Sequence, residues 1–170
     1  MDPVRNPYAP GAGQRPPELA GRDNELGQFE VVLERIARGR PERSIVLTGL
    51  RGVGKTVLLN SFRSMAMQRL WGTGKIEARP DQSIRRPIGS ALHMAIREVA
   101  PRHRAPDRVD DFLGVLKAFL ARDPKAAKGS AISQLGIDVP MARGRADSGD
   151  LEIDLTELLT DAAGVAADLG

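Results

Sequence analysis

The sequence contains no cysteine, so disulfide bonds and thiolate metal sites are excluded. It has only two histidines, His93 and His103, and without cysteine beside them we expect both to be surface residues rather than metal ligands. No apolar run approaches the length of a membrane span, and prolines interrupt the first residues, where a leader peptide would need such a run. These absences predict a cytoplasmic chain with no membrane partner.

Aromatic residues are scarce, at 4% of the chain, although the net charge is +3 and the isoelectric point is near 9.7. A basic chain can bind nucleic acid or an acidic membrane face. Here the arginines are scattered, and almost no aromatic side chains that could stack on bases lie between them. We therefore interpret most of the positive charge as solvated surface. The 170 residues suffice for one ordinary domain.

One motif is highly specific: residues 49–56 read Gly-Leu-Arg-Gly-Val-Gly-Lys-Thr and match the phosphate-binding pattern G-x-x-x-x-G-K-[ST] at every fixed position. Before it, the β-branched and apolar residues 44–48 predict a short buried strand. After it, apolar residues at helical spacing predict a helix that runs to about Leu70. The motif thus lies in the strand–loop–helix context that a phosphate-binding loop requires.

Each residue type of the loop has a distinct predicted role. Gly49, Gly52 and Gly54 lack a Cβ atom, so their backbone can come close to phosphate oxygens, and the helix N-terminus adds unpaired N–H groups. Lys55 would reach the β- and γ-phosphates of ATP, and the Thr56 hydroxyl would bind Mg²⁺. We assign the catalytic roles to Lys55 and Thr56, and the metal-binding role to Thr56. The predicted nucleotide contacts in and beside the loop are Gly49, Arg51, Gly52, Val53, Gly54, Lys55, Thr56 and Val57.

The N-terminal residues predict two further elements. Residues 1–17 are rich in proline, glycine and polar residues and predict an extended arm, either a tail or a strap that runs past a nucleotide base. Residues 24–38 follow as an amphipathic helix with Asp23 as its N-cap. Gly21 and Arg22 precede the cap, where a tight turn could place the guanidinium over a purine or against a helix end.

The front of the chain resembles a known family. Residues 18–26 read E-L-A-G-R-D-N-E-L, and together with the helix, the strand and the loop they resemble the front end of AAA+ ATPases of the origin-recognition/initiator-like group. The resemblance covers residues 17–70 well and thins beyond them. It implies an α/β P-loop NTPase fold, a three-layer sandwich around a parallel sheet, with ATP and Mg²⁺ as cofactors.

The same resemblance implies where the nucleotide lies. In that family, the Gly-Arg-x-x-Glu box and the strap before it line the adenine pocket. Carried over to this sequence, this implies that Tyr8, Pro10 and Arg22 lie near the base. Residues 49–56 would then hold the phosphates.

Residues beyond the loop predict mainly helices. Asp154 and Glu157 have the spacing of a capping box, so Asp154 is the predicted N-cap of the last helix. The predicted elements are a strand over 75–79, helices over 87–100, 108–122 and 155–168, and a hairpin that pairs 131–139 with 151–153.

Hydrolysis by this class of protein requires a second strand that ends in acidic residues, which position Mg²⁺ and the attacking water. No run of four apolar residues followed by Asp-Glu or Asp-Asp occurs in the sequence. We therefore expect residues 18–170 to form the N-terminal portion of a P-loop ATPase domain whose sheet is incomplete at the C-terminal end. Such a chain would be marginally stable or aggregation-prone when expressed alone, and it would bind ATP without turnover by itself.

ATP binding as part of an AAA+-like ATPase is the leading functional prediction, and two alternatives stay open. One is a nucleotide-gated DNA-binding or scaffolding module of the initiator type, although no helix-turn-helix segment is visible to support DNA as a partner. The other is a small P-loop kinase, which carries the same loop pattern but also needs an acceptor site. A homo-oligomer or a protein partner is compatible with each of these functions.

Overall fold

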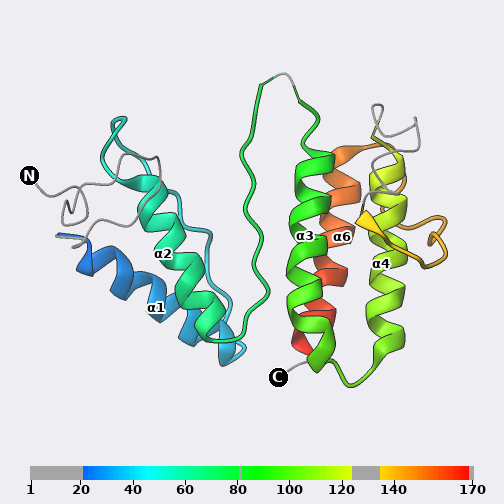
Figure 1. The fold of residues 1–170 in the computed structure, drawn as a ribbon, viewed down its shortest axis with the longest axis horizontal. Coiled ribbons are helices and arrows are strands. Elements are labelled where there is room, and N and C mark those ends of the chain that lie inside the picture. Colours follow the sequence, from blue (N-terminus) through cyan, green and yellow to red (C-terminus); the bar gives the residue numbers. More distant parts are fainter. Residues whose placement is uncertain (1–20, 81, 124–134, 169–170) are drawn as a thin grey trace, which may run out of the picture. The chain divides into compact units, whose positions relative to one another are not determined.

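The computed structural model describes residues 21–80, 82–123 and 135–168 (Figure 1). These residues divide into two compact units, with the boundary between Arg69 and Leu70. None of the described helices is both long and apolar enough to cross a membrane. The first unit contains α1 (Asp23–Ala37) and α2 (Lys55–Gln68), and the second contains α3 (Arg85–Val99), the 3-10 helix η2 (Ala100–Arg102), α4 (Pro106–Ala121) and α6 (Leu151–Ala167).

The described residues contain no β-strand, which corrects the predicted α/β fold. Residues 44–48 and 75–79, both predicted as strands, lack regular secondary structure. The side chains of Ile45 and Val46 are 42% and 80% exposed, whereas a buried strand would cover them. β-branched residues favour an extended backbone, but a strand also needs a neighbouring strand that pairs with its N–H and C=O groups. The predicted three-layer sandwich with a parallel sheet is therefore wrong, and the described fold is helical.

In the first unit, α1 and α2 pack through one apolar face of each helix. Leu33 on α1 and Phe62 on α2 are buried. The rings of Phe29 and Phe62 stack with their centroids 4.2 Å apart and their planes inclined by 15°. At the end of α2, Arg69 donates to the Glu34 carboxylate of α1 at 3.3 Å. These contacts hold α1 beside the helix that follows the phosphate-binding motif.

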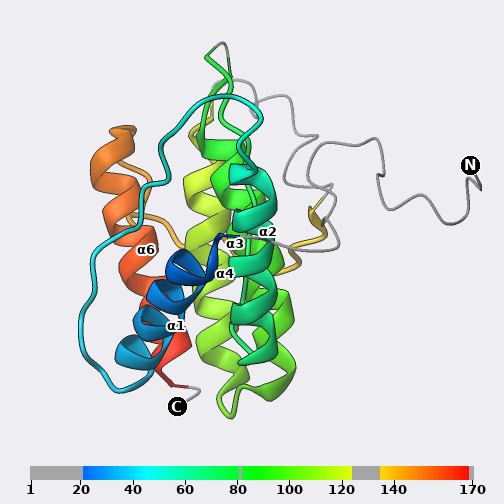
Figure 2. The ribbon, with the colours of Figure 1, turned by 90° about the vertical axis from the view of Figure 1, so that its left-hand side faces the viewer.

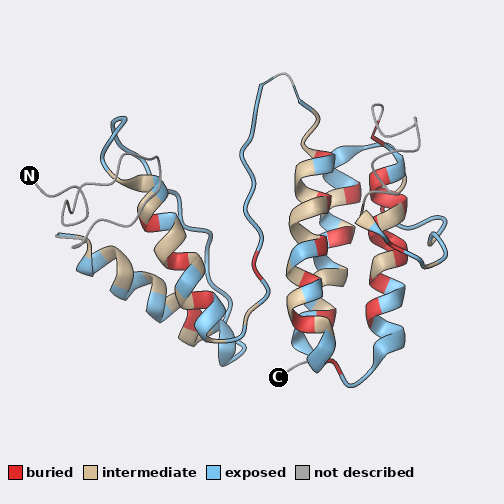
Figure 3. Cartoon of the chain, viewed as in Figure 1, coloured by how far each residue is buried: buried red, intermediate tan, exposed pale blue. Residues whose placement is uncertain are grey.

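The second unit is a bundle in which α3, α4 and α6 lie side by side, as both Figure 1 and Figure 2 show. Its buried residues lie on all three helices (Figure 3), and α4 carries the most of them. Gly89 lets α3 approach α4 closely, because a Cβ atom there would overlap the buried side chain of Leu120. The core residues of α4 are Val109, Phe112, Val115, Leu116, Phe119 and Leu120.

Residues 72–74, just before the predicted strand, lie against α3. A Cβ atom on Gly72 or Gly74 would come within 2.6 or 2.7 Å of the backbone of α3, so only glycine allows this approach. Between these glycines, the backbone N–H and the hydroxyl of Thr73 both donate to Glu98, at 2.9 and 3.2 Å. The predicted strand itself, residues 75–79, is exposed and has no regular secondary structure.

The last helix begins earlier than predicted. Asp150 is its N-cap and accepts hydrogen bonds from two N–H groups of the first turn, at 2.9 and 3.1 Å. Residues 151–153, predicted as a hairpin strand, form that first turn, so the hairpin is wrong; residues 131–134 of its other half lie outside the described residues. Asp154 is therefore not a cap but an inward-facing residue of α6.

Asp154 forms a buried ion pair with Arg85 of α3. The two side chains are 0% and 6% exposed, and the Arg85 Nη2 atom lies 2.7 Å from the carboxylate. The carboxylate also accepts hydrogen bonds from the hydroxyl and N–H of Ser148 and from the N–H of Gly149. The Arg85 guanidinium lies over the Phe119 ring, 4.9 Å from its centroid. This network joins α3, α4, α6 and the loop before α6.

Both histidines are buried, in contrast to the surface positions predicted for them. His93 is 6% exposed and His103 is 9% exposed. Burial, together with the nearby positive charge of Arg97, lowers the pKa of His93, which favours its neutral form. Among the described residues, no cluster of three or more His, Asp or Glu side chains could hold a metal ion by itself.

Candidate nucleotide-binding site

The phosphate-binding motif forms an irregular turn that ends at the N-terminus of α2. Gly54 is the N-cap, with φ at 83°, and Gly52 has φ at 87°. Side chains with a Cβ rarely adopt this backbone conformation, so the turn depends on glycine at both positions. A Cβ atom at either glycine would meet no other atom within 4 Å. The requirement is therefore conformational, and open space lies beside the loop backbone.

Lys55 is the first residue of α2, and its ammonium group turns back onto the loop. Its Nζ atom donates to the backbone carbonyls of Gly49, at 2.8 Å, and Leu50, at 2.6 Å. Both acceptors are neutral, and a phosphate oxygen would be a stronger acceptor because it is charged. Lys55 is thus held at the loop by bonds that a phosphate group can replace.

Arg22 connects the beginning of α1 to the same loop. Its Nη1 atom donates to the Glu25 carboxylate at 2.6 Å, and its Nη2 atom donates to the backbone carbonyl of Val53 at 2.7 Å. Sequence reasoning left two positions open for this guanidinium, over a purine or against a helix end. In the structure it lies at the loop just before α2.

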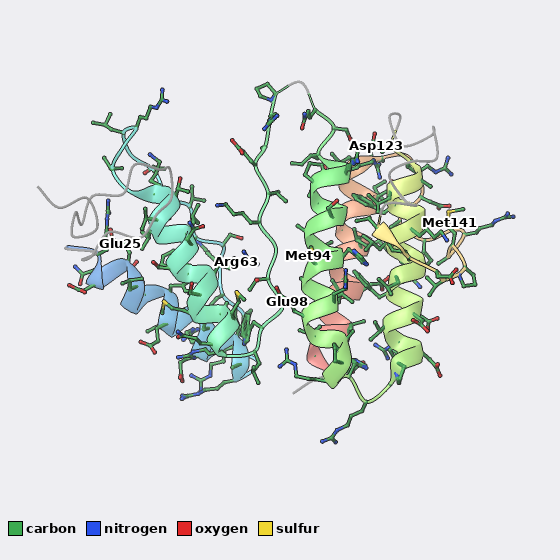
Figure 4. The ribbon with its side chains drawn as sticks, viewed as in Figure 1. Glu25, Arg63, Met94, Glu98, Asp123 and Met141 are labelled. Atoms are coloured by element: carbon green, nitrogen blue, oxygen red, sulfur yellow. The ribbon has the colours of Figure 1, made fainter. Side chains whose placement is uncertain are left out.

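Glu25, in the first turn of α1, is the glutamate of the Gly-Arg-x-x-Glu box, but it was not among the residues predicted to contact the nucleotide (Figure 4). The hydrogen bond from Arg22, followed by a backbone hydrogen bond at Glu25 itself, holds the pKa of Glu25 below its usual value. Glu25 is therefore ionised at neutral pH and accepts a charged hydrogen bond. The pairing of Arg22 with Glu25 could have been predicted from their spacing, because residues three apart on a helix surface are neighbours.

The remaining predicted contacts lie on the loop, in the first turn of α2 or outside the described residues. Thr56 is an exposed residue in the first turn of α2, and Val57 beside it is half-buried. Arg51 is exposed on the loop. Tyr8 and Pro10, predicted near the base, lie outside the described residues, as does the whole predicted arm. The structure thus gathers the predicted phosphate contacts at one helix end.

An open hollow of about 520 Å³ on α1 is a separate feature of the first unit. Asp23 and Glu42 are among the residues that line it, and none of its lining residues comes from the loop. Glu42 is paired with Arg35, but none of the lining residues is a lysine or an arginine that could bind a phosphate group. The loop, not this hollow, is therefore the candidate anion site.

Comparison with known proteins identifies the class of this chain. The AAA ATPase domain family matches residues 18–169, nearly the whole chain, and the chain belongs to that family. Membership supports a nucleotide-binding, AAA+ ATPase-like function, and the family match by itself does not distinguish the origin-recognition/initiator-like group. No curated protein and no solved structure matches the chain.

Proposed function

We propose that this chain binds Mg-ATP, with the phosphates held by the loop of residues 49–56. The observation that carries the proposal is the position of Lys55, whose ammonium lies at the N-terminus of α2 on two neutral loop carbonyls. A helix N-terminus offers N–H groups that have no partner within the helix, and the helix dipole favours an anion there. Family membership supports the same function.

Each residue has a separate task in this proposal. Lys55 exchanges its two carbonyl bonds for bonds to the β- and γ-phosphates, and the N–H groups of the loop bind the remaining oxygens. Mg²⁺ would be held by the Thr56 hydroxyl together with phosphate oxygens, where it neutralises part of the phosphate charge. Binding is the proposed activity of this chain, because its sequence has no apolar run that ends in an acidic pair to position an attacking water.

Lys55→Ala is expected to weaken Mg-ATP binding about 100-fold or more, since it removes at least two charge-assisted hydrogen bonds to phosphate. Calorimetric titration of Mg-ATP into the full chain measures this. Circular dichroism of both proteins checks that the helices are retained. Lys75→Ala is the matched control, because Lys75 is an exposed lysine of the second unit.

Two results would contradict the proposed function. One is a folded wild-type chain that binds no Mg-ATP. The other is a folded Lys55→Ala chain that binds Mg-ATP with wild-type affinity. If Lys75→Ala weakened binding as strongly as Lys55→Ala, the effect would be one of overall charge, and the assignment of the phosphates to this loop would fail.

A further inference from the structure

Arg22 forms a hydrogen bond with the backbone of the loop, which is distant from it in the sequence. The Nη2 atom bonds the carbonyl oxygen of Val53, 31 residues away in sequence. The Nη1 atom is held by Glu25 at 2.6 Å, which restricts the guanidinium. A planar guanidinium can make both bonds at once, one from each terminal nitrogen. Arg22 therefore links the first turn of α1 to the residue before the N-cap of α2.

The Val53 carbonyl shares a peptide group with the Gly54 N–H. This group is planar, and no cis peptide bond occurs among the described residues, so the two bonds point in opposite directions. When Arg22 fixes the direction of the carbonyl, it also fixes the N–H, which points away from Arg22. A contact that fixes the direction of the Val53 C=O bond therefore also fixes the direction of the Gly54 N–H bond.

This peptide group is poorly fixed without Arg22. Gly54 tolerates a wide range of φ, including its observed value of 83°, so the peptide can rotate at low cost. Val53 is exposed, and its side chain is 40% accessible, so packing restrains it little. The hydrogen bond from Arg22 is the described contact that holds this carbonyl in place.

We propose that Arg22 is a positioning residue for phosphate binding: it anchors the Val53 carbonyl so that the Gly54 N–H stays directed at the bound phosphate, and Glu25 orients its guanidinium. The inference rests on the proposed function, because it assumes that the loop binds phosphate. It differs from the role of a base contact, since a residue that aims a loop N–H affects every ligand that carries the phosphates. The identity of the base is then irrelevant to the effect of Arg22.

The test compares a nucleotide with the phosphate chain alone. Wild type, Arg22→Ala and Arg22→Lys are titrated with Mg-ATP and with inorganic tripolyphosphate in the presence of Mg²⁺. Arg22→Ala is expected to lower the affinity for both ligands by the same factor, roughly tenfold. This factor corresponds to the loss of one hydrogen bond from a charged donor. Arg22→Lys should restore part of the affinity for both, because an ammonium can still donate to a carbonyl. Arg38→Ala is the matched control, because Arg38 also forms an ion pair with a glutamate of α1, Glu34, but lies exposed at the C-terminal end of that helix.

Several outcomes would overturn the inference. If Arg22→Ala weakens Mg-ATP but leaves tripolyphosphate unchanged, Arg22 contacts the base. If both affinities stay at the wild-type level, the anchor is irrelevant to binding. If wild type binds Mg-ATP but not tripolyphosphate, the loop does not hold phosphates independently of the base. If wild type binds neither ligand, the proposed function itself fails.

A second measurement needs no ligand. It tests the anchoring of the peptide group by Arg22 even if the proposed function, Mg-ATP binding, fails. The Gly54 amide resonance of the ¹⁵N-labelled full chain is recorded by NMR. In wild type we expect one sharp resonance, and in Arg22→Ala a shifted or broadened one as the peptide group samples other orientations on the microsecond to millisecond timescale. Glu25→Ala should produce a smaller change in the same direction, and Arg38→Ala none. An unchanged Gly54 resonance in a folded Arg22→Ala chain would show that Arg22 does not anchor this peptide group.

Discussion

Asp154→Asn is expected to lower the free energy of unfolding of the second unit by about 3–5 kcal/mol, the usual cost of removing one partner from a buried ion pair. Asp154 is fully buried and Arg85 is 6% exposed, so the guanidinium would be left without its counter-charge. Within the described residues, the Arg85 Nη1 atom is already buried without a hydrogen-bond partner. The Phe119 ring, the Gly149 carbonyl and the neutral amide oxygen introduced by the substitution would then compensate only part of the charge.

Urea unfolding measures this effect, followed by circular dichroism and by the fluorescence of Trp71. Trp71 is the only tryptophan and belongs to the second unit, so its signal reports on that unit. Arg145→Ala is the matched control. Arg145 also bonds two carboxylates of α6, Glu157 and Asp161, but its side chain is 48% exposed, so its loss should cost at most about 1 kcal/mol.

A double variant keeps this prediction testable if Asp154→Asn fails to fold. Arg85→Leu combined with Asp154→Leu removes both charges and leaves apolar side chains in the same place. Replacing a buried ion pair by packed apolar residues is often close to neutral, so the double variant should be markedly more stable than either single one. Ser148 and Gly149, which would lose their acceptor, are exposed and can bond water. A double variant as unstable as Asp154→Asn would contradict the proposed energetics of the pair.

The same pair makes the second unit sensitive to acid. Burial by itself raises the pKa of Asp154, but the hydrogen bonds from Ser148, Arg85 and Gly149 outweigh it, and the net pKa lies below its usual value. A carboxyl whose pKa is lower in the folded than in the unfolded chain stabilises the fold above its unfolded pKa, and this stability is lost as pH falls through its folded pKa. Stability should therefore decline below about pH 4, and this decline should be weaker in Asp154→Asn.

Phe119→Ala is the second change with a large expected effect. Phe119 is 0% exposed in the core of the second unit, and truncation of a buried phenylalanine costs about 3–5 kcal/mol through lost burial and the cavity left behind. The same urea unfolding experiment measures it. Leu159→Ala on α6 is the control, because Leu159 is 48% exposed and its loss should change stability by less than about 1 kcal/mol.

Phe119→Leu separates the two contributions of this side chain. Leucine retains most of the apolar volume but has no ring for the Arg85 guanidinium, which lies 4.9 Å from the centroid. Phe119→Leu should therefore cost less than Phe119→Ala, with about 0.5–2 kcal/mol of its cost due to the cation–π contact. A loss below about 1 kcal/mol for Phe119→Ala would show that the bundle does not depend on this core position.

The helices were largely predictable from the sequence because their signal is local. Apolar residues three and four apart placed α1, α3 and α4 within two or three residues of their observed ends. The start of α6 was wrong, because Asp154 and Glu157 have the spacing of a capping box although Asp150 makes the cap. Asp150 lacks that spacing, since Ile153 stands three residues after it, but aspartate is a favoured N-cap residue by itself, and only the fold shows which aspartate binds the free N–H groups.

The strands were predicted wrongly for a different reason. Residues 44–48 have the composition of a buried strand, but composition specifies no partner. Just before the predicted strand over 75–79, the sequence showed glycines at 72 and 74 without showing that they allow contact with α3. A strand is a property of two segments, so a pattern read along one of them could not establish it.

By itself, the sequence contained the motif and the glycines that its turn needs, and it predicted a nucleotide as the ligand, because these depend on residues adjacent in the chain. The tertiary structure alone decided which side chains meet groups that are distant in the sequence. It placed Arg22 on the Val53 carbonyl, 31 residues away, and Arg85 on Asp154, 69 residues away. Such pairs form only when packed helices bring distant side chains together, since hydrogen bonds and buried charges act over a few ångströms in space, whatever the separation in sequence.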